Sequence, residues 1–136
     1  MTIQHQQRAV DLGIVITESE RSLAFYRDLL GMVHEGDMPM PIGGGGTMHR
    51  LRCGDSLIKL VCFEATPESR PGKGGIQGGT GYRYFTIHMS NINEVVDACS
   101  AAGVKIVTPV VELRPKVTIA IVEDPDGNLV EFLQMG

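Results

Sequence analysis

The sequence predicts an α+β protein made of two tandem βαβββ modules. In each half of the chain an apolar strand leads into an amphipathic helix that stops at a glycine, and the half ends with a hairpin. The halves also repeat at a nearly constant offset, because Leu57-Ile58-Lys59-Leu60 corresponds to Leu129-Val130-Glu131-Phe132, 72 residues later. Strand, helix and hairpin in the same order twice predict a duplicated module.

The first module is expected over residues 9–64, beginning with a buried strand at residues 10–16. A helix follows with Thr17 or Ser19 as its cap, and Thr17 and Glu20 have the spacing of a capping box. Its apolar positions recur at helical spacing: Leu23, Phe25, Tyr26, Leu29 and Leu30. Gly31 is the predicted stop.

Three strands complete this module. A less regular strand is expected near residues 32–36, and residues 47–53 and 57–63 are predicted to form a hairpin around Gly54-Asp55. A segment at residues 65–81, rich in Gly and Pro, then leads to the second module as a linker or a mobile lid.

The second module is expected over residues 82–135 and begins with a strand at residues 84–89. Asn91 and Glu94 are predicted to cap a helix that ends at Gly103. Its predicted apolar face consists of Ile92, Val95, Cys99 and Ala102.

The rest of the second module mirrors the first. A strand is expected near residues 105–111, and residues 117–123 and 129–134 are predicted to pair around a turn at residues 124–128. The Asp-Gly pair in that turn permits the positive φ that such a turn requires.

Composition excludes several classes of function. The chain has 136 residues and a net charge of −4, which gives no reason to expect a nucleic-acid partner. The three cysteines have no C-x-x-C spacing and are expected to be buried free thiols. A polar N-terminus and the lack of long apolar stretches favour a cytoplasmic protein with no membrane partner.

Two strings resemble a known family. SLAFYRDLLGM (residues 22–32) and DPDGNLVEF (residues 124–132) resemble the vicinal oxygen chelate superfamily, which includes glyoxalases, bleomycin resistance proteins and extradiol dioxygenases. The resemblance covers about residues 9–135 and implies a single domain in which the two modules form a curled mixed sheet with a central cleft. It also implies a homodimer.

The resemblance further implies a quartet of ligand positions in the cleft, which fall on Asp11, Lys59, Tyr84 and Glu131. Metal enzymes of this family hold a divalent ion there with two His and two Glu or Gln. An ammonium group has no lone pair, so Lys59 cannot ligate a cation and disfavours a divalent cofactor. Asp11 and Glu131 alone are weak metal candidates.

The quartet makes sense without a metal in two ways. Lys59 could neutralise Asp11 and Glu131 as a structural salt bridge. It could instead bind an anionic ligand, or act as an acid or base, with Tyr84 as a hydrogen-bond donor. Strand alternation places His88 on the face of Tyr84, where it could be a proton shuttle, a substitute ligand or a structural hydrogen-bonding group.

The resemblance implies a protein that acts on a small oxygenated or anionic metabolite, as a lyase, isomerase or dioxygenase relative. Glu131, Lys59 and Tyr84 are the catalytic candidates, and Asp11, His88 and Arg114 are the substrate-binding candidates. One alternative is a small-molecule-binding protein without catalysis, of the bleomycin-resistance type. A structural or regulatory partner without ligand chemistry is another.

Overall fold

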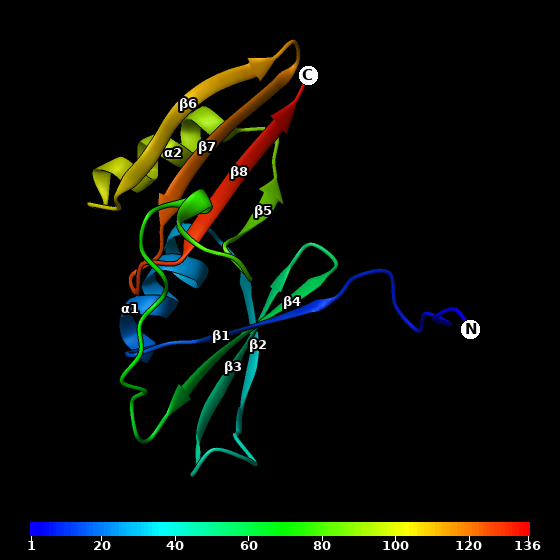
Figure 1. Cartoon of the computed structure of the whole chain (residues 1–136), viewed down its shortest axis with the longest axis vertical. Helices are drawn as coiled ribbons and strands as arrows, with labels where there is room; N and C mark the ends of the chain where they lie inside the picture. Colours follow the sequence, from blue (N-terminus) through cyan, green and yellow to red (C-terminus); the bar gives the residue numbers. More distant parts are fainter. The chain divides into compact units, whose positions relative to one another are not determined.

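The computed structural model describes residues 1–136, which divide into two compact units, residues 1–68 and residues 69–136. Each unit contains a four-stranded sheet and two helical segments, and Figure 1 labels the main elements along the chain. The elements of the first unit are β1 (Asp11–Val15), α1 (Ser19–Leu23), η1 (Ala24–Leu29), β2 (Val33–Pro39), β3 (Gly46–Cys53) and β4 (Ser56–Phe63). Those of the second unit are η2 (Ile76–Gly78), β5 (Tyr84–His88), α2 (Ile92–Ala101), β6 (Ile106–Arg114), β7 (Val117–Glu123) and β8 (Leu129–Met135).

The two sheets have the same topology. Their strand orders are β1-β4-β3-β2 and β5-β8-β7-β6. In each sheet the first strand pairs in parallel with the last strand of the module, and the remaining pairs are antiparallel. This confirms the predicted α+β class and the tandem βαβββ plan.

The first helical stretch differs from its predicted cap. Glu18 is the N-cap of α1, between the two predicted cap residues, and its side chain makes no cap hydrogen bond. The stretch continues as a π-helical segment, η1, which carries the fully buried Tyr26. Phe25 meets Tyr26 edge-on with ring centroids 4.7 Å apart, so the widened turn fills the core with two aromatic rings.

Helix α2 begins at the predicted residue but is capped differently. The amide of Ile92 donates to the side-chain oxygen of Gln134 on β8 at 2.9 Å, and the N-cap Asn91 makes no side-chain cap bond. The buried side chains of α2 are Ile92, Val96 and Cys99, so Val96 takes the place predicted for Val95. A glutamine from the sheet therefore fixes the start of the helix.

The core of each unit consists of apolar side chains from the sheet and its helix. Fully or nearly fully buried examples are Ile16, Leu51, Leu60, Ile92, Val122, Val130 and Phe132. The three cysteines are free, and only Cys99 among them is buried. No helix of the chain is long and apolar enough to cross a membrane.

The turn between β6 and β7 carries the one non-glycine residue with positive φ, Lys116 at 67°. A side chain in the left-handed region costs about 1–2 kcal/mol relative to glycine. We expect Lys116→Gly to raise the unfolding free energy by about 0.5–1 kcal/mol, because glycine also has more unfolded-state entropy to lose. Urea denaturation checks this, and an unchanged or lower midpoint would contradict it.

Candidate functional site

In the first unit, Asp11 on β1 and Lys59 on β4 form an ion pair, with Lys59 Nζ 3.1 Å from Asp11 Oδ2. Both side chains are 34% exposed. Gln7 also donates to Asp11, at 3.2 Å. The hydrogen bond from Lys59, and then that from Gln7, holds the pKa of Asp11 below its ordinary value. The Lys59 amine thus favours the carboxylate form of Asp11.

Two arginines share this sheet face with Lys59. Arg50 lies opposite Lys59 in the β3–β4 register, and Arg52 is two residues further along β3. Arg52 forms a two-pronged contact with Glu35 at 3.0 and 3.1 Å, which lowers the pKa of Glu35. Arg50 has no carboxylate within ion-pair distance. This sheet face therefore carries three cations but only two carboxylates, Asp11 and Glu35. Arg50 is the cation that has no carboxylate partner.

In the second unit, Glu131 on β8 accepts a hydrogen bond from the hydroxyl of Thr86 at 2.7 Å. Thr86 is opposite Glu131 in the parallel β5–β8 register. Tyr84 and His88 lie two residues to either side of Thr86 on β5, and both are exposed. Thr86 was not among the sequence candidates, although alternation placed it on this face. Arg114 is exposed at the end of β6.

The four positions implied as metal ligands do not fit a divalent ion. Lys59 offers only N–H donors, and Asp11 already accepts from it. Glu131 is engaged by Thr86, and a neutral Tyr84 is a poor ligand. A cation placed beside the Lys59 ammonium would be repelled. We therefore derive no chemistry through a metal at these positions.

A strap, residues 69–81, lies over part of the second sheet. Arg83 holds it by donating to the backbone carbonyls of Lys73, Gly75 and Ile76, at 3.1, 2.5 and 3.3 Å. Ile76 packs against a buried apolar cluster formed by Val117, Ile119, Ile121 and Leu129. The glycine-rich segment is thus tied down by one guanidinium and one apolar anchor.

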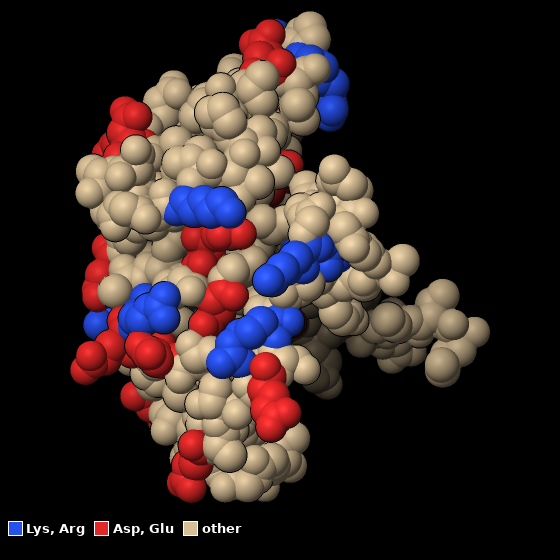
Figure 2. All heavy atoms as spheres, turned by 60° about the vertical axis from the view of Figure 1, so that its left-hand side comes forward, with Lys and Arg blue, Asp and Glu red and all other residues tan.

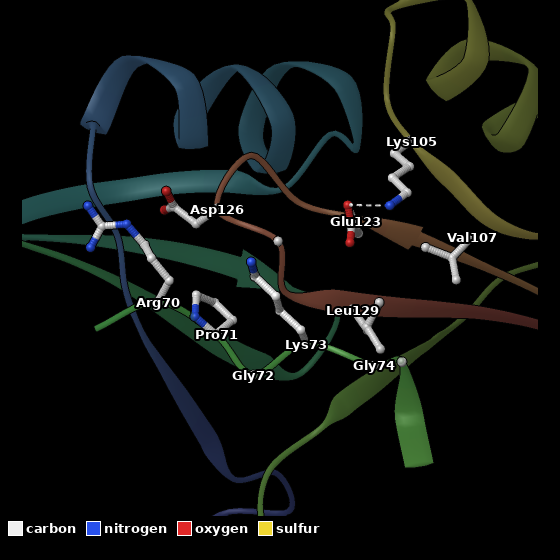
Figure 3. Close-up of a pocket in the computed structure, with 12 residues that line it drawn as sticks. Arg70, Pro71, Gly72, Lys73, Gly74, Lys105, Val107, Glu123, Asp126 and Leu129 are labelled. Carbon is white, nitrogen blue, oxygen red and sulfur yellow. Dashed lines mark ion pairs between the residues drawn. The ribbon is translucent and has the colours of Figure 1, made fainter. Parts of the chain in front are cut away.

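A pocket of about 420 Å³ lies beside this strap. Figure 3 shows the side chain of Lys73 pointing from the strap toward the turn that carries Asp126. On the other side, Lys105 pairs with Glu123 at 3.7 Å. Cationic and anionic side chains alternate around this opening, so it has no single sign of charge.

A second polar cluster in the first unit joins four side chains. Nδ1 of His49 is 2.7 Å from Asp37 Oδ1, and Nε2 of His34 is 2.6 Å from the same oxygen. The other ring nitrogen of His49 is 2.8 Å from the hydroxyl of Ser19. His49 is buried at 6% exposure. These contacts lower the pKa of Asp37, with the His34 hydrogen bond as the larger cause.

The sequence candidates did not include this cluster, because His34 and Asp37 are three residues apart in the sequence. Residues three apart on a regular strand point to opposite faces. The β2–β3 register shifts between His34 and Gly36, so that His34 and Asp37 reach the same face. Asp37 is then directly opposite His49.

The lowered pKa of Asp37 predicts a pH-dependent contribution to stability. A carboxyl group whose pKa falls on folding stabilises the protein above its unfolded pKa, about 3.9, and loses this effect as the pH falls through its folded value. Asp37 is 47% exposed, so screening limits the effect to on the order of 1 kcal/mol. Asp37→Asn should be less stable by this amount at pH 5, and the gap should close by about pH 2. A gap that stays constant in urea titrations across this range would contradict the assignment.

Charge on the molecular surface is mixed. On the face drawn in Figure 2, lysine and arginine side chains lie next to aspartate and glutamate rather than forming a region of one sign. On this face the mixture of signs agrees with the small net charge of −4.

A duplicated βαβββ plan with polar side chains on matching strands defines a class of small α+β proteins. The family model of the Glyoxalase/Bleomycin resistance protein/Dioxygenase superfamily matches residues 6–132. The chain belongs to this superfamily, as the sequence resemblance indicated.

Solved structures agree on the fold. A glyoxalase family protein from Bacillus cereus has 17% identity and a TM-score of 0.83, over 99% of this chain and 98% of that one. The trypanothione-dependent glyoxalase I of Leishmania major has 21% identity and a TM-score of 0.71, over 95% and 87%. A virulence protein from Salmonella typhimurium has 24% identity and a TM-score of 0.65, over the whole of both chains. No curated protein matches the chain by sequence.

Proposed function

We propose that the chain binds a small anionic or oxygenated metabolite and catalyses proton transfer on it without a metal, as an isomerase or lyase relative. The observation that carries this proposal is the Lys59–Asp11 ion pair at 3.1 Å, between two residues that the sequence resemblance implies as metal-ligand positions. A fixed ammonium group can stabilise a developing oxyanion, which is the task of the metal in related enzymes.

Arg50 supports an anionic ligand. Lys59 and Arg52 each have a carboxylate partner, whereas Arg50, opposite Lys59, has none. A guanidinium binds a carboxylate or phosphate through two parallel hydrogen bonds. A small carboxylate bound by Arg50 would place its neighbouring oxygen near the Lys59 amine.

Glu131 is the proposed base. It is partly buried on β8 and accepts one hydrogen bond from Thr86, which fixes one of its oxygens and leaves the other able to take a proton. Tyr84 and His88 are the proposed donors to the ligand, and Arg114 and Asp11 complete the set of proposed ligand contacts.

Binding is tested by calorimetry on the full chain with oxalate, lactate and pyruvate as probes. Arg50→Gln should weaken binding of the best probe about tenfold or more, since a charge-assisted hydrogen bond contributes about 1.5–3 kcal/mol. Lys116→Gln removes the same charge at the β6–β7 turn and should leave binding unchanged. Equal affinities in both variants would overturn the proposed anion site.

Catalysis is tested separately by proton exchange. In D2O, the full chain should exchange protons next to the carbonyl of pyruvate, and this exchange should persist after treatment with a chelator. Glu131→Gln should lower the exchange rate about 100-fold or more while binding is retained. Binding without exchange in the unmodified chain would favour the sequestering alternative.

The superfamily includes many proteins that form dimers, and we propose a homodimer for this chain. Analytical ultracentrifugation checks it, and a single monomeric species at micromolar concentration would contradict it.

A further inference from the structure

Five side chains around His49 form one continuous hydrogen-bond network. The network runs from Arg27 in η1 through His34 and Asp37 on β2 to His49 on β3, and it ends at Ser19 in α1. Its contacts are 3.3 Å from Arg27 Nη1 to His34 Nδ1, 2.6 and 2.7 Å from the two histidines to Asp37, and 2.8 Å from His49 to Ser19. None of the proposed ligand contacts uses these residues.

Arg27, at one end of this network, determines which group donates and which accepts in each hydrogen bond. Arginine can only donate, so Nδ1 of His34 accepts from Arg27 and the proton of that ring is on Nε2. His34 therefore donates to Asp37, which remains a carboxylate and also accepts from Nδ1–H of His49. In a neutral His49 the other ring nitrogen, Nε2, then has a lone pair, and this lone pair accepts a hydrogen bond from the Ser19 hydroxyl.

His34, Asp37 and His49 could in principle hold a metal ion, since their ligand atoms lie within 4.8 Å of one another. The distances argue against this. Ligand atoms around a tetrahedral zinc with bonds of about 2.0–2.1 Å are roughly 3.3 Å apart, whereas the contacts to Asp37 are 2.6 and 2.7 Å. Arg27 also keeps the proton on the His34 nitrogen that would have to bind the ion.

We propose that Ser19 is a nucleophile activated by His49 and oriented by Asp37, at a second reactive centre that accepts acyl or phosphonyl groups from small activated electrophiles. Hydroxyl, imidazole and carboxylate stand in the order and at the distances that activate a serine. His49 is buried at 6% exposure, which shields the base from water, whereas Ser19 is only partly buried.

Transfer of the acyl or phosphonyl group to Ser19 needs no further reactant. With an activated ester, Ser19 Oγ bonds to the carbonyl carbon and its proton moves to His49 Nε2. The bond to the leaving oxygen breaks, and that oxygen takes the proton from His49. With a fluorophosphonate, Oγ bonds to phosphorus, the phosphorus–fluorine bond breaks, and fluoride leaves with the proton. The product in both cases is a modified Ser19.

A reporter-tagged fluorophosphonate on the full chain tests the proposal, with the modified residue located by mass spectrometry. Ser19 should react at least about 100-fold faster than Ser100, an exposed serine of α2 that serves as an internal standard. Ser19→Ala should abolish the fast labelling, and Ser22→Ala should retain it. His49→Gln should lower the rate at Ser19 to that at Ser100.

His49 is buried, so its replacement can disturb folding; Asp37→Asn, at an exposed position, provides the second variant. It should slow labelling at least about tenfold while circular dichroism stays native, because the wrong proton arrangement on His49 removes the acceptor for Ser19. Equal labelling of Ser19 and Ser100 in the unmodified chain would overturn the proposal. Stoichiometric protection of Ser19 by Zn²⁺ would also overturn it, since His34 would then carry no proton on Nε2.

Discussion

Gly46→Ala should destabilise the chain by about 2–6 kcal/mol, the sum of about 1–3 for a strained backbone and about 1–3 for overpacking. Gly46 starts β3 with a φ of 145°, a conformation that L side chains rarely adopt. A β-carbon there would press against the carbonyl oxygen of Cys62 and lie 2.7 Å from the Cα of Phe63. Both obstacles are backbone atoms of the paired strand, so neither can rotate away.

Gly44→Ala is the matched control for this substitution. Gly44 also has a positive φ, 85°, but nothing lies within 4 Å of the place that a β-carbon would take, so only the conformational cost of about 1–2 kcal/mol applies. Guanidinium denaturation of the two variants gives the comparison. Equal midpoints would show that the β3 and β4 backbones separate to admit a methyl group.

Arg83→Met should release the strap and speed amide exchange in residues 74–78 about 100-fold. The guanidinium donates to three backbone carbonyls of the strap, and a charged donor contributes about 1.5–3 kcal/mol per hydrogen bond in favourable geometry. Methionine keeps the length of the side chain but offers no donor. Exchange measured by mass spectrometry on the full chain reports the opening directly.

Two variants calibrate this result. Arg83→Lys keeps the charge but loses the forked geometry, so it should give an intermediate exchange rate. Lys105→Met removes a cation that lines the pocket beside the strap and makes only an exposed 3.7 Å pair with Glu123, so it should leave the strap unchanged. Unaltered exchange in Arg83→Met would mean that the packing of Ile76 alone holds the strap.

Much of the fold could be predicted because it depends on periodicity. The repeat at 72 residues and the spacing of apolar side chains predict the βαβββ order of elements in both modules, and the two sheets share that order. The helix starts were less predictable, since a cap can come from a distant strand. Gln134 caps α2 from 42 residues away, and no local spacing reveals it.

The candidate sites could likewise be predicted only in part, because some of their contacts depend on residues far away in the sequence. The Lys59–Asp11 contact was anticipated as one of two alternatives because the family resemblance implies both residues among its four ligand positions. The unmatched Arg50 was not, because whether an arginine finds a partner depends on the neighbouring strand. The Ser19 cluster was missed because a single bulge between His34 and Gly36 reverses the side to which a strand residue points.

The topology of the two sheets would allow the chain to be produced as two separate fragments. Every ladder joins strands from the same half, and β1 and β5 each close on the last strand of their own module. A break in the backbone between residues 68 and 69 therefore separates no hydrogen-bonded strand pair. Two independently translated fragments would each retain a complete set of interstrand bonds, which makes this chain a candidate for complementation from split halves.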